Sequence, residues 1–586
     1  MKQKSDALIG YQGANPFSDI QPRSFSDEKV SKEFYPTSVF WSLFNDQHEV
    51  LIGRRGSGKT FLLKMMRQSM LKTIRSPLAE KLVREKQYVA FYVPMQLEIV
   101  SHFRSLEDHA NDNLVLFNYF FNSILAESIL SELKTFFTDD SDTSIETEIK
   151  LAREICSVWF GSNDHIARIH TLDDIIDRVR SMYYAYDLDR GDLSTIPSVF
   201  RREICTPLVA ITKIIARTLQ LNDPTFIVCV DEAEFLNENM LKCINTVFRS
   251  NKDRIVLKVA TLPFYYSTTK TLAPNCSVAA GHDFEYCLVD IAYDSEDYTQ
   301  LTNKLCEYRI ASRTPDIMVQ FSTLEDFLGC VGKDALIDYY RAEFGKEIAT
   351  RETIEAGIIN SFSESRRQGA NEYPQRRKTI YDKFAPIYFV RQMYLRSRQG
   401  NSTPGWYAGA DVVRKITDGN PRLFIQLMNA LFEKARQTKL TPKAQHAVIA
   451  KFAKDFCEAT QGIEEYGPLA HTYLDLIGNA LKRVVHGGPL VSVSCAFKLS
   501  IKGKQSGQLR WMEEAIAYSR VNVPEEDVLT GLTLETRYSL SFLYATNYWI
   551  PMRKDSPRTI QLKELEKGNS YIINMDDPQF PEGEPV

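Results

Sequence analysis

Five short apolar runs in the chain each have the length of a β-strand. They lie at residues 50–52, 88–93, 226–230, 255–260 and 284–291. Unbroken apolar runs of this kind are typical of parallel strands that are buried on both faces, and helical patterns follow several of them. The pattern therefore predicts an α/β fold in which a parallel sheet is flanked by helices.

The chain between the second and third runs is long, and its pattern is helical. In residues 112–137, DNLVLFNYFFNSILAESILSELKTFF, apolar positions recur at helical spacing, so core packing is the default interpretation. The interval at about 95–222 is therefore predicted to be a helical insertion.

A glycine-rich loop follows the first apolar run and leads directly into a helical pattern. The pattern GxxxxGK[ST] is filled from Gly53 to Thr60. Glycines let the backbone turn so that its N–H groups face phosphate oxygens, while the lysine reaches the β- and γ-phosphates and the hydroxyl holds Mg²⁺. The loop thus predicts binding of ATP and Mg²⁺, with these nucleotide-binding candidates: Gly53, Gly56, Ser57, Gly58, Lys59, Thr60 and Phe61.

Two later runs end in polar residues that suit the same chemistry. The third run ends in Asp231 and Glu232, and the fourth ends in Thr261. In open α/β sheets, ligands bind at the carboxyl ends of the strands. Asp231 is expected to bind the metal through water, Glu232 to polarise the attacking water, and Thr261 to lie beside the γ-phosphate. The alternatives are a solvated pair of acids and an ordinary threonine at a strand end.

Far downstream, Gly419-Asn420-Pro421-Arg422 interrupts the chain before a helical pattern resumes. Proline suits the first turn of a helix. A cation such as Arg422 is unusual there, because the helix N-terminus favours anions. Its position makes sense if Arg422 meets a phosphate.

Composition narrows the class of protein. The chain has 586 residues, 44 % hydrophobic and 25 % charged, with a formal net charge of −4, so it is not a uniformly basic nucleic-acid coat. Its ten cysteines form no CxxC pair, which argues against zinc ribbons and dithiol redox sites. The N-terminus lacks the apolar run of a signal peptide, and no run approaches the roughly 18 apolar residues of a membrane span. A cytoplasmic protein without a membrane partner is expected.

Positive charge is concentrated locally in two places. Nine Lys and Arg residues lie from Arg366 to Arg398, interleaved with tyrosines, and a basic turn runs from Arg553 to Arg558 between two extended pieces. Such residues can neutralise phosphates and stack on bases, although a solvated basic face is equally compatible with the first segment. Helices followed by a basic-tipped hairpin favour a winged helix within residues 441–575, which contacts DNA or protein. Residues 576–586 form an acidic tail.

The order of these motifs resembles AAA+ ATPases, most closely the initiator (origin-recognition) clade and the STAND-type switch ATPases. The resemblance implies an N-terminal segment (1–30), an ATPase core (31–292), a helical lid (293–440) and a winged-helix domain after it. It also implies that Thr261 is sensor 1 and Arg422 is sensor 2. The implied catalytic residues are Lys59, Glu232, Thr261 and Arg422, and the implied metal ligands are Thr60 and Asp231.

The sequence also departs from that family pattern. Lys59 and Asp231 lie 172 residues apart, and no arginine occurs from Ile255 to Tyr308, where ring-forming relatives carry an arginine finger. Arg249 and Arg254 are substitutes only if the subunit interface differs. Two functions therefore remain open, an ATPase whose nucleotide state controls DNA binding or remodelling, and a STAND-like switch. The switch would act on a protein effector or form a homo-oligomer, for example in antiphage defence. A degenerate ATPase with little turnover is a third alternative.

Overall fold

The described residues fall into two units. The structure, a computed structural model, describes residues 6, 8–19, 26–95, 110–137, 142–161, 169–189, 196–250, 254–262, 265–266, 268–292, 295–313, 323–329, 356–357, 359–360 and 407–459, with four short strands between residues 497 and 574. Residues 21–290 form one unit, here called the sheet unit. Residues 1–20 and 291–586 form the other, here called the helical unit.

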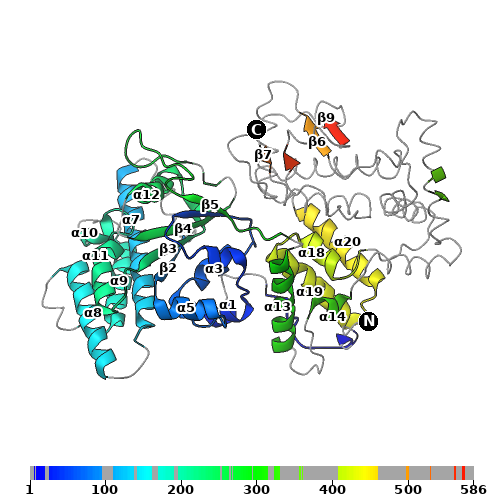
Figure 1. Cartoon of the computed structure of the whole chain (residues 1–586), viewed down its shortest axis with the longest axis horizontal. Helices are drawn as coiled ribbons and strands as arrows, with labels where there is room; N and C mark the ends of the chain where they lie inside the picture. The colour runs from blue at the N-terminus through cyan, green and yellow to red at the C-terminus, as the bar shows by residue number, and fades with distance from the viewer. Residues whose placement is uncertain are drawn as a thin grey trace. The chain divides into compact units, whose positions relative to one another are not determined.

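A five-stranded parallel sheet lies at the centre of the sheet unit (Figure 1). Its strands are β1 (Glu49–Ile52), β2 (Tyr88–Pro94), β3 (Thr225–Asp231), β4 (Ile255–Thr261) and β5 (Glu285–Leu288). Their order across the sheet is β2-β3-β4-β1-β5, and every neighbouring pair is parallel. The five apolar runs thus form five strands, which confirms the predicted α/β fold. β5 is shorter than its apolar run because it pairs only with the four residues of β1.

The two faces of the sheet bury alternate residues of each strand. Along β3, Phe226 and Val228 face one core, while Ile227 and Cys229 face the other. The first core is shared with the helices between β2 and β3 and with α12 (Glu238–Arg249). The second is covered by helices of the N-terminal part, namely α1 (Asp27–Glu33), α2 (Ser38–Ser42), α3 (Lys59–Met65), α4 (Gln68–Leu71) and α5 (Pro77–Glu85). Burial on both faces explains why β1 to β4 are unbroken apolar runs, whereas Tyr286 and Leu288 of the edge strand β5 are about half exposed.

The chain between β2 and β3 forms helices that pack on one another and on the sheet. They are α7 (Ala110–Lys134), α8 (Asp142–Phe160), α9 (Leu172–Asp189), α10 (Ser198–Arg201) and α11 (Thr206–Thr218). By length and composition alone, Leu114–Lys134 of α7 could cross a membrane. However, Leu125, Ile129 and Leu133 have no exposed surface and belong to the first core, which α7 shares with the sheet. In this unit α7 is a core helix.

Helices make up the well-described part of the helical unit. They are α13 (Glu296–Arg313), α14 (Leu324–Leu328), α18 (Ala410–Thr417), α19 (Pro421–Gln437) and α20 (Pro442–Glu458). Two short strand pairs follow: β6 (Phe497–Ser500) is parallel to β9 (Tyr571–Asn574), and β7 (Val528–Leu529) is antiparallel to β8 (Ile560–Gln561). The predicted basic-tipped hairpin, the rest of the predicted winged helix and the acidic tail lie outside the described residues.

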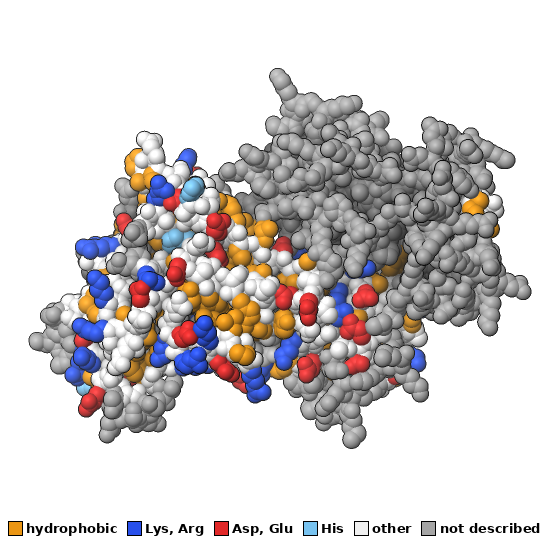
Figure 2. Space-filling model, viewed as in Figure 1, with side chains coloured by type: hydrophobic (Ala, Val, Ile, Leu, Met, Phe, Trp, Pro, Cys, Tyr) orange, Lys and Arg blue, Asp and Glu red, His pale blue; other side chains and the backbone are white. Residues whose placement is uncertain are grey.

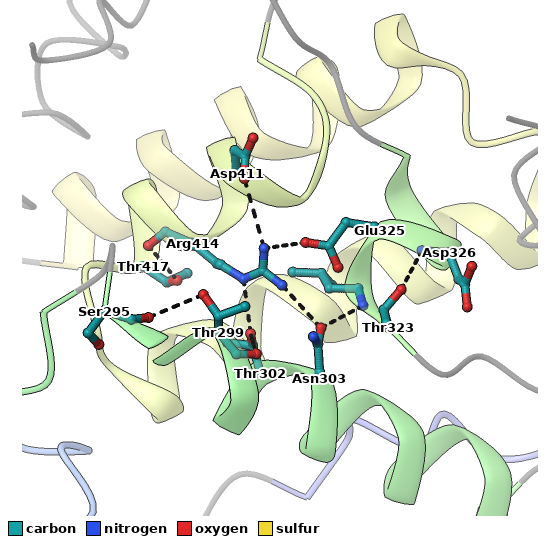
Figure 3. A network of polar contacts seen from close by, with 11 residues as sticks. Ser295, Thr299, Thr302, Asn303, Thr323, Glu325, Asp326, Asp411, Arg414 and Thr417 are labelled. Atoms are coloured by element: carbon teal, nitrogen blue, oxygen red, sulfur yellow. Dashed lines mark hydrogen bonds and ion pairs between the residues drawn. The ribbon is translucent and has the colours of Figure 1, made fainter. Parts of the chain in front are cut away.

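A buried arginine joins three helices of this unit (Figure 3). Arg414 of α18 is 5 % exposed. Its Nε and Nη2 lie 3.1 Å from Thr302 Oγ1 and Asn303 Oδ1 of α13, and its Nη1 donates to Glu325 of α14. Although burial opposes ionisation, the hydrogen bond from Arg414 holds the pKa of Glu325 below its usual value. We call this group of four residues the Arg414 clamp.

The N-terminal residues 8–19 are part of the helical unit. Asn15 Nδ2 lies 2.8 Å from Glu433 Oε1 of α19, and Arg309 Nη1 of α13 donates to the Asp19 carbonyl oxygen at 2.9 Å. The Phe17 side chain is fully buried. The chain therefore begins in the helical unit, builds the sheet unit and returns to the helical unit at residue 291.

Charges of both signs are interspersed over the visible face of the sheet unit (Figure 2). The sheet unit also contains exposed ion pairs, such as Lys134 with Asp173 and Arg180 with Glu127. The two basic segments of the sequence, Arg366 to Arg398 and Arg553 to Arg558, lie outside the described residues. The prediction of DNA contact therefore concerns parts of the chain that the structure does not describe.

Candidate nucleotide site

The glycine-rich loop joins β1 to α3 at the carboxyl end of the sheet. Gly56 and Gly58 have φ angles of +90° and +96°, in the left-handed region that favours glycine. A Cβ built on Gly53 would stand 2.7 Å from Ser57 Oγ, closer than real side chains approach. The N–H and hydroxyl of Ser57 both donate to the Arg54 carbonyl oxygen, at 3.2 and 3.0 Å. The loop thus turns back on itself, and its conformation requires glycine at these positions.

Lys59 is buried beneath this loop. It is 8 % exposed, and its Nζ donates to the carbonyl oxygens of Gly53 and Arg54, the latter at 2.9 Å. Thr60 and Phe61 follow in the first turn of α3. Both are partly buried, and the Phe61 ring packs against the second core. The loop therefore holds its ammonium group in a fixed place, beside a threonine hydroxyl that could ligate a metal.

Two donors fix the carboxylate of Asp231 at the end of β3. Asp231 is 1 % exposed. The Tyr92 hydroxyl of β2 donates to its Oδ2 at 2.8 Å, and the Glu232 N–H donates to its Oδ1 at 3.0 Å. Burial, together with the Asp231 charge, raises the pKa of Tyr92 well above its ordinary value, so the phenol keeps the proton that it donates. Carboxylate oxygens of this kind are the ligands that Mg²⁺ takes in proteins.

Glu232 and Thr261 have features that are common at binding sites. Glu232 has a φ of +62°, a strained conformation for a residue other than glycine. Thr261 ends β4 and is fully buried, and its Oγ1 has no hydrogen-bond partner within the structure described. Its carbonyl oxygen accepts the N–H of Gly53 at 3.3 Å, so Thr261 lies beside the start of the loop. Since buried hydroxyls are normally bonded, this one is suited to a ligand oxygen.

Two further acids lie near the loop, and the sequence reasoning did not single them out. Burial raises the pKa of Glu234, while the nearby Lys59 opposes the shift, and its Oε2 is buried with no hydrogen-bond partner among the described groups. Burial also raises the pKa of Asp290 to about 6, against the charges of Arg54 and Lys59. Each had a weak signal in the sequence: Glu234 follows the Asp-Glu pair closely, and Asp290 interrupts the last apolar run.

Arg422 occupies the first turn of α19 in the helical unit. The Asn420 side chain caps this helix, because its Oδ1 accepts the N–H groups of Arg422 and Leu423 at 2.9 and 3.2 Å. Gly419 has a φ of +66°, and a Cβ there would meet the Ile291 carbonyl oxygen at 1.6 Å. The Gly-Asn-Pro-Arg motif thus builds a capped helix start. The structure brings Lys59, Asp231, Glu232 and Thr261 into one unit, whereas Arg422 belongs to the other.

The two arginines that precede β4, Arg249 and Arg254, are both engaged in ion pairs. Arg249 Nη1 lies 2.7 and 3.0 Å from the carboxylate oxygens of Asp283, and Arg254 pairs with Asp223. Both arginine side chains are about half exposed, at 54 % and 46 %. Because solvent screens guanidinium groups that are this exposed, either arginine could exchange its partner at little cost.

A parallel sheet with a glycine-rich loop after β1 and acids at the end of β3 is the arrangement of a P-loop NTPase. A comparison with protein families matches residues 15–560 to the ORC-CDC6-like family, and the chain belongs to this family. No curated protein and no solved structure matches the chain. The protein is therefore an origin-recognition-like member of the AAA+ ATPases, which confirms the resemblance to the initiator clade.

Proposed function

We propose that the protein binds ATP with Mg²⁺ at the loop from Gly53 to Thr60 and hydrolyses it. The loop N–H groups and Lys59 would bind the phosphates. Thr60 would hold the metal directly, and Asp231 through water. Bound Mg²⁺ supplies charge neutralisation for the phosphates. Glu232 would orient and polarise the attacking water, and Thr261 would donate to the γ-phosphate.

One observation carries this proposal, the convergence of three kinds of group at one edge of the sheet. A buried ammonium lies under a loop that needs glycine, a buried carboxylate is fixed at the end of β3, and the Thr261 hydroxyl at the end of β4 has no partner among the described residues. Burial of the unbonded Thr261 hydroxyl beside these two charged groups costs stability. The cluster is explained if a ligand with phosphate oxygens and a metal completes it.

We further propose that the nucleotide state controls DNA binding or remodelling. Membership in an origin-recognition-like family supports this, as do the basic segments Arg366 to Arg398 and Arg553 to Arg558. Arg422 would sense the γ-phosphate and move the helical unit. The seven cysteines from Cys156 to Cys306 are all free, which supports a reducing, cytoplasmic location.

A STAND-like switch is the alternative, and one observation favours it. Arg249 and Arg254 are paired within the chain, and the sequence has no arginine from Ile255 to Tyr308. A subunit ring that completes its site with a neighbour's arginine would have to supply it from elsewhere. Under this alternative, ATP would promote assembly or release of a protein effector, for example in antiphage defence, without DNA.

The test compares wild type with Lys59→Ala and Glu232→Gln, with Lys72→Ala as the control. Lys72 lies just after α4, and its exposed side chain only caps a carbonyl oxygen of Thr135. ATP binding should be lost in Lys59→Ala and kept in the other two variants. Turnover should be stimulated by duplex DNA at about 50 mM salt and less at about 200 mM, because phosphate contacts weaken with salt. ATP-dependent assembly without any DNA effect would favour the switch, and no ATP binding by the wild type would refute both.

A further inference from the structure

Helix α7 of the insertion contacts the residues that hold the carboxylate of Asp231. Two of its polar residues, Ser128 and Glu132, are four positions apart and therefore lie on one face of the helix. Ser128 Oγ accepts the backbone N–H of Tyr92 at 2.9 Å. Because β2 pairs only with β3 among the described strands, this bond satisfies an N–H at the open edge of the sheet.

Glu132 reaches the Tyr92 ring indirectly, through Arg67. It is 3 % exposed, and its carboxylate accepts the hydroxyl of Ser69 at 2.7 Å and the N–H of Ser69 at 3.1 Å. Arg67 Nη1 lies 3.6 Å from Glu132 Oε1. The Arg67 guanidinium in turn lies 5.9 Å from the centre of the Tyr92 ring, within the range of cation–π attraction. Helix α7 thus holds both the backbone and the ring environment of Tyr92.

Tyr92 then passes this constraint to the candidate metal ligand. Its hydroxyl donates to Asp231 Oδ2 at 2.8 Å, while Oδ1 accepts a backbone N–H that comes from β3 itself. The orientation of the carboxylate therefore depends on one side chain from another strand. Hydrogen bonds behind a metal ligand fix its orientation, and their loss typically weakens metal affinity or activity by about 10- to 100-fold.

We propose that Tyr92 is a positioning residue for the Asp231 carboxylate and that Ser128 and Glu132 set its position, so that the helical insertion is coupled to Mg²⁺ binding. The inference rests on the proposed function, since it assigns Mg²⁺ to Asp231. It gives the insertion a role in the chemistry beyond covering the sheet, because a displacement of α7 changes how Asp231 meets the metal.

The experiment measures binding of a fluorescent ATP analogue while Mg²⁺ is titrated, and again in EDTA. Tyr92→Phe keeps the ring and removes only the hydroxyl. It should raise the Mg²⁺ concentration for half-maximal binding about tenfold and change the affinity in EDTA by less than about twofold. A general loss of folding would instead weaken binding of the analogue both with Mg²⁺ and in EDTA. Tyr88→Phe is the matched control, since Tyr88 lies on the same face of β2 and contacts the Phe44 ring instead.

The second arm tests the link to α7. Glu132→Gln should raise the Mg²⁺ requirement severalfold, whereas Glu127→Gln on the same helix should not, because Glu127 forms an exposed pair with Arg180. The double variant Tyr92→Phe/Glu132→Gln should resemble Tyr92→Phe alone, since both changes act through one hydroxyl.

Three outcomes would contradict the inference or its basis. A wild-type Mg²⁺ requirement in Tyr92→Phe would overturn the positioning role. Fully additive effects in the double variant would overturn the coupling through Tyr92. If the wild type binds the analogue no better than Lys59→Ala, the proposed nucleotide site itself is wrong, a result that the first two outcomes do not produce.

Discussion

The Arg414 clamp and the strand-end site both bury charged and polar groups, but they differ in how those groups are satisfied. Each nitrogen of the Arg414 guanidinium has a partner on a neighbouring helix. At the strand ends, Thr261 Oγ1 and Glu234 Oε2 have none among the described groups, and Glu232 is strained. Satisfied buried groups fix the fold, whereas unsatisfied or strained ones cost stability and persist where a ligand completes them. The two regions should therefore respond differently to substitution.

Glu232→Gln should give the largest effect, and it should be on turnover alone. Replacing the group that polarises water should lower ATP hydrolysis by about 10²- to 10⁴-fold, while ATP binding and thermal stability stay near wild type. Steady-state phosphate release measures hydrolysis, titration calorimetry measures ATP binding, and scanning calorimetry measures thermal stability. Glu238→Gln is the control, because Glu238 lies at the exposed start of α12 and pairs only with Lys242. Normal turnover in Glu232→Gln would remove Glu232 from the chemistry.

Arg414→Ala should have the opposite profile, a large loss of stability in the helical unit. The change leaves Glu325, whose side chain is 30 % exposed, without its guanidinium and should cost about 1.5–3 kcal/mol, as loss of a hydrogen bond to a charged group does. Denaturant unfolding followed by circular dichroism measures it. Lys451→Ala should leave unfolding unchanged, since that lysine forms an exposed pair with Asp455 on one helix. A loss no larger than in Lys451→Ala would mean that the clamp does not stabilise the unit.

Local signals in the sequence predicted the elements better than the contacts between them. The apolar runs identified five strands, and β3 and β4 end at Asp231 and Thr261, where the apolar pattern stops. Nothing local shows that Tyr92 meets Asp231, because that contact depends on the register in which Val93 pairs with Val230. No local pattern indicates that residues 8–19 pack with α13 and α19, since contacts between distant segments of the chain leave no periodic signal.

The same reason explains why two polar residues were not foreseen. Asp290 reaches Gly53 only because β5 pairs in parallel with β1, which places its Oδ1 3.3 Å from the Cβ that Gly53 lacks. Arg414 lay in a helical pattern among other charges, where a solvated position is the usual expectation. Burial of a charged residue is set by the elements that cover it, and these come from distant parts of the chain.

Asp290→Asn should change how the stability of the sheet unit depends on pH, which tests whether the strand-end site holds an acid that ionises at a cost. Burial raises the pKa of Asp290 from 3.8 to about 6, so the stability that its protonated form gives is complete below pH 3.8 and is lost as pH rises through 6. Relative to the variant, the wild type should lose up to about 3 kcal/mol between pH 4 and pH 7. Thermal unfolding at a series of pH values measures the difference.

Asp283→Asn is the control for Asp290→Asn, with the opposite sign. Although burial opposes it, hydrogen bonds from the Ala279 N–H and from Arg249 lower the pKa of Asp283. Its contribution to stability is therefore present at pH 7 and is lost as pH falls below its ordinary pKa. Parallel pH profiles for the two variants would contradict the assignment of Asp290 as a partly buried acid that ionises at a cost.

Thr261→Val should give the smallest change in stability. Unlike Thr225→Val, it should not destabilise the protein, so the two variants can be compared directly. Thr261 and Thr225 are both fully buried strand residues, but the Thr225 hydroxyl donates to Asp46 at 2.7 Å, while the Thr261 hydroxyl has no described partner. Thr225→Val should cost about 0.5–1.5 kcal/mol, because it removes one hydrogen bond, whose acceptor Asp46 is 58 % exposed and stays hydrated. Thr261→Val removes an unsatisfied group and should leave stability unchanged or raise it by about 1 kcal/mol, while ATP turnover falls severalfold. Equal losses of stability in the two variants would mean that the Thr261 hydroxyl stabilises the fold. It would then not be a free donor for a phosphate.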